Sequence, residues 1–339
     1  MRQNNIFLML LKVFFFSSIL VATSAVRAEL KVVTTIKPLH SLIANVMDGV
    51  GEPALIIEGS TSPHSFTLKP SHAKLLEEAD IIFWVGESIE TFMERPLESI
   101  VKNAEVVEFM EVESINKLKF REESIFEDHD DHDDHDDHDD HDDHDDHDDH
   151  DDHDDHDDHD DHSGHDHHGH AHGEFDAHIW LDPMNAKEMV HEIAHELGDL
   201  DPANKNKYEA NAQATIQALD QLVNDIEKGI NKDAKFVVFH DAYQYFEERF
   251  GVRAAGALTL NTDVLPGAKQ IADIQDVIKD RGIKCIFSEP QFNPKIITTI
   301  AEDMNIKTGV FDPLGANIDS NKDLYFKLIQ NLGNELKGC

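Results

Sequence analysis

Short apolar runs alternate with segments of helical spacing along most of this chain, and few folds satisfy that pattern. The runs are uninterrupted, as in parallel strands buried on both faces, whereas strands of a half-exposed sheet alternate apolar and polar residues. The predicted strands are KVVTTI, PALIIEG, ADIIFWVG and AEVVEFM in the first half, and AKFVVFH, KCIFSEP and IKTGVFDP in the second. The sequence therefore predicts an α/β protein with mostly parallel sheets.

A long segment of helical spacing separates the two groups of strands. It extends from about Asn185 to about Ile230, and Asp201-Pro202 either kinks it or begins a second helical segment. We therefore predict two (βα) lobes, residues 29–184 and 231–339, joined by one long helix over residues 185–230.

The same segment contains His191, Glu192 and His195 as HEIAH, and Gly198 and Asp201 extend it to HExxHxxGxxD. Two histidines at i and i+4 with a neighbouring glutamate can serve a zinc metalloprotease. At 100° per residue, however, both histidines lie about opposite the apolar stripe of the helix. The sequence thus favours a solvent-exposed helix face, with a secreted zinc metalloprotease as the alternative.

A low-complexity segment interrupts the first lobe, where the triplet Asp-Asp-His repeats as far as His162. Residues 128–173 hold 24 aspartates and 17 of the 24 histidines, without Lys, Arg or Glu. A repeat without apolar residues cannot form a core, so residues 122–175 are expected to form a disordered loop. Removing these 24 aspartates from the formal net charge of −40 leaves −16, which disfavours nucleic acid and anionic membranes as partners.

The first 28 residues are typical of a secretory signal peptide. Arg2 and Lys12 flank a short apolar stretch, and cleavage is expected after Ala28. A transmembrane anchor is the alternative, but Lys12 interrupts the apolar run and the part after it is short. No cysteine lies near the cleavage site, which argues against a lipid anchor, so a periplasmic location fits best.

Cys285 and Cys339 are the only two cysteines in the chain. In an oxidising compartment such a pair usually forms a disulfide, with two free thiols as the alternative. The bridge would attach the C-terminal tail to a predicted core strand.

Four segments share one pattern, in which an apolar strand ends in a potential metal ligand. The potential ligands are His64 in ALIIEGSTSPHSF, His178 in HIWLDP, His240 in KFVVFHDAY and Asp312 in KTGVFDPLG. Ligands of open α/β sheets bind outside the carboxyl ends of strands, and two of these segments precede the long helix while two follow it. A site between the lobes is therefore predicted, and three imidazoles with one carboxylate suit Zn²⁺. We interpret His40 and His72 as structural.

Around these residues the sequence resembles the substrate-binding proteins of ABC importers of the zinc and manganese type, and most closely the zinc-uptake members. The resemblance covers nearly all of the mature chain, in the order of the family. It rests on VVTTIKPLHSLIANV, PHSFTLKPSHAKLLEEADIIFWVG, HIWLDPMNAKEM, ELGDLDPANKNKYEAN, FVVFHDAYQYFEERFG, CIFSEPQFN and FDPLG. It implies two lobes on a rigid helix and a monomer without enzymatic activity that carries one Zn²⁺ to a membrane permease.

The resemblance also assigns ligands. It implies that His64, His178 and His240 hold the ion, with Asp312 at the fourth position. Manganese-type members have a glutamate where His240 stands, so zinc is favoured and a manganese-type importer subunit is the alternative.

Other positions bear on the resemblance. Pro63 replaces a glutamate that can ligate the metal in some zinc-type relatives, so either the aspartate or water completes the shell. Cys285 and Cys339 fall where zinc-type members have a disulfide.

For the His/Asp repeat, we expect many weak, exchangeable sites that collect or buffer zinc near the cleft, because imidazoles and carboxylates both bind zinc. An inert acidic spacer is the alternative. A general metal-storage protein that depends on the loop alone is a further candidate function.

Overall fold

The computed structural model describes residues 29–126, 174–260, 262 and 266–339. The predicted signal peptide and the His/Asp repeat lie outside these described residues. Within the described ranges, every helix is too short or too polar to cross a bilayer.

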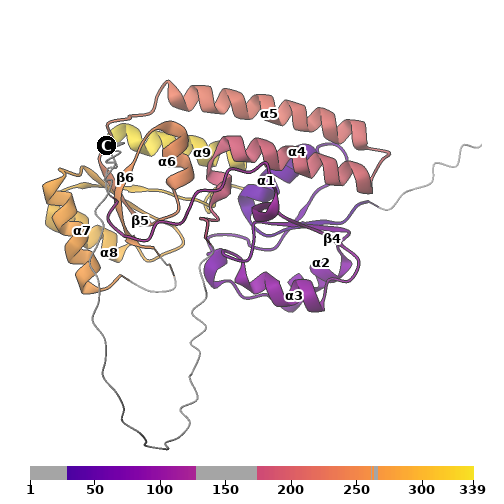
Figure 1. The fold of residues 1–339 in the computed structure, drawn as a ribbon, viewed down its shortest axis with the longest axis horizontal. Coiled ribbons are helices and arrows are strands. Elements are labelled where there is room, and N and C mark those ends of the chain that lie inside the picture. The colour runs from indigo at the N-terminus through magenta and orange to yellow at the C-terminus, as the bar shows by residue number, and fades with distance from the viewer. Residues whose placement is uncertain (1–28, 127–173, 261, 263–265) are drawn as a thin grey trace, which may run out of the picture.

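Two lobes lie side by side beneath the helix α5 (Figure 1), and each is built on a four-stranded parallel sheet. The strand orders are β2-β1-β3-β4 and β6-β5-β7-β8, so the first strand of each lobe is internal. The strands are β1 (Val32–Thr34), β2 (Ala54–Leu55), β3 (Ile81–Trp84) and β4 (Glu105–Glu108), then β5 (Phe236–His240), β6 (Ala254–Thr259), β7 (Cys285–Ser288) and β8 (Lys307–Val310). The predicted α/β class with parallel sheets is confirmed.

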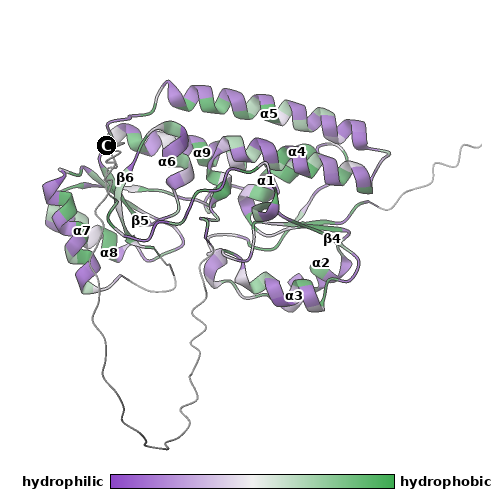
Figure 2. Cartoon of the chain, viewed as in Figure 1, coloured by the Kyte–Doolittle hydropathy of each residue, from purple (hydrophilic) through white to green (hydrophobic). Residues whose placement is uncertain are grey.

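Helices cover both sheets, and Figure 2 shows hydrophobic and hydrophilic residues on the same helices, as expected when one face packs on a core. The N-terminal lobe has α1 (Lys37–Val46), α2 (Pro70–Glu78) and α3 (Glu94–Ser99). The C-terminal lobe has α6 (Gln244–Phe250), α7 (Ala268–Asp280), α8 (Lys295–Met304) and α9 (Leu324–Glu335).

The segment between the lobes forms two helices, α4 (Pro183–Leu200) and α5 (Lys205–Glu227). They run antiparallel (Figure 1), and the Asp201 carboxylate accepts hydrogen bonds from Asn204 and Tyr208 at the turn. Of the two possibilities at Asp201-Pro202, a second helical segment is therefore observed. Helix α5 spans both lobes (Figure 1), because it packs on α1 and α4 and also on α9 of the C-terminal lobe.

One hydrophobic core joins the lobes on the side of α5. Leu39 and Ile193 of the N-terminal half belong to the same buried cluster as Phe311 and Tyr325 of the C-terminal half. A smaller cluster lies beneath α7 and α8. Because apolar packing is continuous under α5, the lobes are not independent units on this side.

Polar contacts reinforce this junction. The buried Lys37 ammonium, at the start of α1, donates to the carbonyl oxygens of Gly315 at 2.6 Å and Ile318 at 2.6 Å. The Ser41 hydroxyl donates to the carbonyl oxygen of Lys322 at 2.9 Å. Both contacts tie the first helix of one lobe to a loop of the other.

Sequence reasoning missed strand β6. Its AAGALT sequence is rich in alanine and glycine, which are depleted in strands. Gly256 forms an isolated antiparallel bridge with Ile125, and a Cβ at position 256 would lie 2.6 Å from the carbonyl oxygen of Ser124. Close packing of a segment from the first half of the chain thus requires glycine here.

The disulfide between Cys285 and Cys339 is present, with 5.6 Å between the Cα atoms. It connects buried strand β7 to the C-terminal residue, as predicted.

Candidate metal centre

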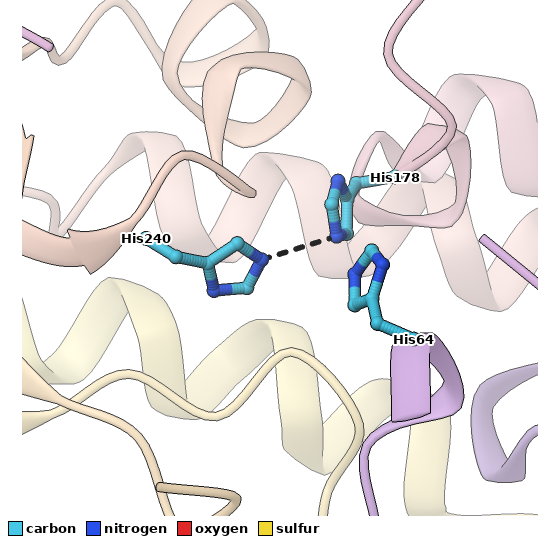
Figure 3. Close-up of side chains that lie close together, drawn as sticks. All are labelled: His64, His178 and His240. Atoms are coloured by element: carbon cyan, nitrogen blue, oxygen red, sulfur yellow. Dashed lines mark hydrogen bonds between the residues drawn. The ribbon is translucent and has the colours of Figure 1, made fainter. Parts of the chain in front are cut away.

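The imidazoles of His64, His178 and His240 converge between the lobes (Figure 3). One ligand nitrogen from each ring lies within 4.8 Å of the other two. No other group of three or more His, Cys, Asp or Glu side chains converges in this way among the residues that the structure describes. The predicted grouping of these three histidines is therefore observed.

One histidine ends a strand, and the other two lie in or directly before short 3₁₀ turns. His240 is the last residue of internal strand β5, and it lines a small cavity together with His64 and His178. His64 lies in a 3₁₀ turn, Pro63–Ser65, where the Ser62 hydroxyl accepts from the His64 backbone amide at 3.3 Å. His178 immediately precedes a second 3₁₀ turn, Ile179–Leu181.

The expectation that every ligand follows a strand is thus wrong for HIWLDP. This stretch is apolar because Trp180 is fully buried at the junction of the lobes, not because it forms a strand. The Trp180 indole donates to the carbonyl oxygen of Pro313 at 2.8 Å, and the Tyr325 hydroxyl donates to the carbonyl oxygen of Trp180 at 2.7 Å.

Two buried carboxylates fix the orientation of two rings. Asp176 Oδ1 lies 2.7 Å from His178 Nδ1, and Glu289 Oε1 lies 2.7 Å from His240 Nδ1. When Nδ1–H donates to a carboxylate, the proton stays on Nδ1 and the Nε2 lone pair is available to a metal. Both carboxylates were missed from the sequence, although Asp176 stands only two residues before His178.

The Nε2 atoms of His178 and His240 face each other at 3.3 Å (Figure 3). Two nitrogens bound to one tetrahedral zinc at about 2.0–2.1 Å are separated by about 3.3–3.4 Å. The observed separation of these two nitrogens therefore matches that of two ligands on one zinc ion.

The electrostatic field at the site favours a cation. Burial by itself lowers the pKa of His240, but the charges of Glu289, Asp241 and Asp176 outweigh it, so the pKa is raised. The same negative groups stabilise positive charge placed between the rings, whether it is a proton or a metal ion.

The described residues place Asp312 outside the convergent group. Its Oδ1 accepts from the amides of Leu314 at 3.1 Å and Gly315 at 3.0 Å and from the side-chain amide of Gln291 at 3.0 Å. Its Oδ2 accepts from the Ala316 amide at 2.6 Å. Asp312 therefore orders the turn beside the site in this structure.

The other histidines considered from the sequence lie elsewhere. His191 and His195 are exposed on α4, as the helical pattern predicted, and the His195 side chain is 63% exposed. His40 Nε2 is 3.1 Å from the carbonyl oxygen of Pro53, and His72 Nδ1 accepts from the Lys69 amide at the start of α2.

Comparison with known proteins adds independent findings. The family model for ZnuA, described as "Zinc-uptake complex component A periplasmic", matches residues 32–339. The chain is 50% identical over 310 residues to the high-affinity zinc uptake system protein ZnuA of Brucella abortus, covering 91% of each chain.

Solved structures share the fold. One described as "Crystal structure of ZnuA" has a TM-score of 0.67 and 20% identity, covering 90% of this chain and 98% of that one. The laminin-binding protein Lmb of Streptococcus agalactiae, described as having adhesin and metal transporting activity, has a TM-score of 0.66 and 23% identity, covering 91% of this chain and 100% of the other.

Proposed function

Because this chain belongs to the ZnuA family of zinc-uptake components, we propose that it binds Zn²⁺ with high affinity and delivers it to the permease of an ABC transporter. The observation that carries the proposal is the convergence of three imidazoles, with carboxylates holding two Nε2 atoms 3.3 Å apart. Imidazole nitrogens in this arrangement suit zinc. The imidazole of His240 supports zinc over manganese, which prefers oxygen ligands.

We propose that the protein carries the ion without catalysing a reaction. Capture requires a filled coordination shell, whereas a catalytic zinc keeps an open position for substrate. The histidines of the HEIAH segment lie on an exposed face of α4, which supports a solvated surface over a protease site. The protein is proposed to act as a monomer, facing its membrane partner from the periplasm after removal of residues 1–28.

The sequence leaves two candidates for the fourth zinc ligand, Asp312 and a water molecule. Asp312 lies outside the convergent group in the structure, and hydrogen bonds from the 314–316 turn to both of its oxygens hold it there. This supports water as the fourth ligand, with the carboxylate adding negative charge from beside the site.

The His/Asp repeat, which lies outside the described residues, is proposed to collect or buffer zinc near the cleft. Residues on either side of it, Phe120 and Phe175, line the small cavity that reaches the three imidazoles. These described flanking residues therefore lie beside the candidate site.

Replacing His240 by alanine tests the cleft site. We expect the His240→Ala protein to lose tight zinc binding in titrations against a competing chelator, because one of three nitrogen ligands is gone. The matched control is the double variant His191→Ala/His195→Ala, which removes two exposed imidazoles from α4 and should retain wild-type affinity.

The opposite pattern would contradict the proposal. Loss of tight binding in the α4 variant, with retention in His240→Ala, would favour the protease site. Wild-type capacity and affinity in both variants would favour storage by the repeat.

A further inference from the structure

Residues 117–126, here called the strap, extend from the N-terminal half of the chain across the C-terminal lobe. The Leu118 amide donates to the Tyr245 hydroxyl at 2.9 Å, and the Phe126 amide donates to the carbonyl oxygen of Ala255 in β6 at 3.1 Å. The strap thus contacts α6 at one end and the edge strand β6 at the other. The last described segment before the repeat is thus attached to the C-terminal lobe.

Arg121 is the central polar anchor of the strap. Its Nη1 donates to Asp241 Oδ1 at 2.9 Å and its Nη2 donates to Glu247 Oε2 at 2.8 Å. The arginine side chain is 19% exposed, whereas the two carboxylates are 1% and 3% exposed. The guanidinium also lies 4.1 Å from the ring centroid of Phe126, at the other end of the strap. One side chain therefore donates hydrogen bonds to two buried acids and holds the strap against the lobe.

The anchor is directly connected to one metal-binding histidine. Asp241 follows His240, and its backbone amide donates to the carbonyl oxygen of Thr259 in β6 at 3.2 Å. The ion pair with Arg121 also restrains the side chain of Asp241. The end of β5, which sets the direction of the His240 ring, is therefore held on two sides.

A parallel connection reaches the second histidine. The Gln244 amide nitrogen donates both to the carbonyl oxygen of Lys119 in the strap and to Asp176 Oδ2, at 3.1 and 2.8 Å. Asp176 Oδ1 in turn contacts His178 Nδ1, and the Tyr245 hydroxyl donates to the carbonyl oxygen of Asp176 at 2.6 Å. Displacement of the strap would disturb the supports of both rings.

We propose that Arg121 is a positioning residue for zinc capture, acting through the strap on His240 and His178. The inference rests on the proposed zinc-binding function. Arg121 touches neither imidazole, and its effect is to hold the two Nε2 atoms at the separation that one zinc ion requires. This role depends on the geometry of the arginine as well as on its charge. A guanidinium can bridge two carboxylates in fixed directions, whereas the ammonium group of lysine is a point charge.

The test compares Arg121→Lys and Arg121→Met with wild type. Zinc affinity and dissociation rate are measured by chelator competition, and the geometry of the site by the visible absorption spectrum of the Co²⁺-loaded protein. Supporting contacts of metal ligands typically alter affinity by about 10–100-fold. We expect Arg121→Met to weaken zinc binding within that range, to accelerate release and to alter the Co²⁺ spectrum, and Arg121→Lys to be intermediate.

Arg249→Met is the matched control. Arg249 also belongs to a partly buried pair, with Nε and Nη2 donating to the Asp182 carboxylate at 2.6 and 2.7 Å, but this pair lies at the start of α4. We expect it to reduce thermal stability without changing zinc affinity or the Co²⁺ spectrum.

The outcomes separate this inference from the proposed function. Failure of wild type itself to bind zinc tightly would refute the function. Wild-type affinity and spectrum in Arg121→Lys and Arg121→Met, even with reduced thermal stability, would overturn the role of Arg121 alone. A loss of zinc affinity in Arg249→Met as large as that in Arg121→Met would also overturn the role of Arg121. If Arg121→Met does not fold because two buried acids are left unpaired, Arg121→Lys decides the question, and wild-type behaviour in that variant refutes the inference.

Discussion

Replacing Glu289 by glutamine isolates the contribution of one buried negative charge to zinc affinity. Glu289 Oε1 is 2.7 Å from His240 Nδ1, and the carboxylate side chain is only 1% exposed. Glutamine has nearly the same shape, and its amide oxygen can still accept a hydrogen bond from Nδ1–H of His240. The ring should therefore keep its tautomer and orientation while the charge behind it is removed.

The expected effect follows from the short contact and the burial. A carboxylate behind a metal-bound imidazole increases the basicity of the ligand nitrogen, and loss of such a group costs about 10–100-fold in metal affinity. This corresponds to about 1.4–2.7 kcal/mol of binding free energy. Solvent screens the interaction little, because both partners are buried. We expect Asp176→Asn to have a similar effect through His178, since that contact is also 2.7 Å.

The dissociation constant is measured by zinc competition with a chelator, alongside the thermal stability of the metal-free protein. Glu90→Gln is the matched control, because Glu90 is also fully buried but accepts from the backbone amides of Val85 and Gly86. An affinity of Glu289→Gln within twofold of wild type would refute the reasoning. An equal loss of affinity in Glu90→Gln would show that the effect is not specific to the carboxylate behind His240.

Four further outcomes are expected. Asp312→Asn should change zinc affinity by less than about tenfold if water completes the shell; a loss as large as that of a histidine variant would instead make Asp312 a ligand. Deletion of residues 128–173 should reduce the number of zinc ions bound in titration calorimetry without weakening the tightest site, and unchanged stoichiometry would exclude the collecting role. Burial raises the pKa of Glu90 from 4.5 to about 7, so the folded state holds this proton more tightly and stability is lost as pH rises between these values. Chemical denaturation should therefore show the free energy of unfolding of wild type falling by about 3 kcal/mol over that range because of Glu90, and Glu90→Gln should lack this decrease. The same pH profile in Glu90→Gln as in wild type would contradict the prediction. Cys339→Ser should lower the free energy of unfolding by about 4 kcal/mol in the chain-entropy model while leaving zinc affinity unchanged; a loss of affinity would mean that the bridge to Cys285 shapes the site.

The sequence was sufficient for the fold class and for the three histidines. Uninterrupted apolar runs can be buried only where both faces of a strand are covered, so VVTTI and FVVFH indicated parallel strands between helices. The helical period likewise placed His191 and His195 on the exposed face of α4. His240 was correctly placed at the end of a strand, because the apolar run stops at that residue.

Local patterns failed where packing between distant segments determined the outcome. HIWLDP has the composition of a strand, yet Trp180 is buried by the junction of the lobes. Strand β6 has weak strand propensity and is stabilised by β5 on one side and by an isolated bridge to Ile125 on the other. The choice between one kinked helix and two helices at Asp201 also depended on tertiary contacts, because α5 packs back along α4.

The sequence by itself determined the α/β class and which histidines could be proposed as zinc ligands, since both depend on local periodicity and side-chain chemistry. Only the tertiary structure decided how the imidazoles are held. Glu289 supports His240 from 49 residues away, and Arg121 reaches Asp241 across 120 residues. Such partners are selected by the folding of the chain in space, and hydrogen bonds across these separations leave no periodic trace in the sequence.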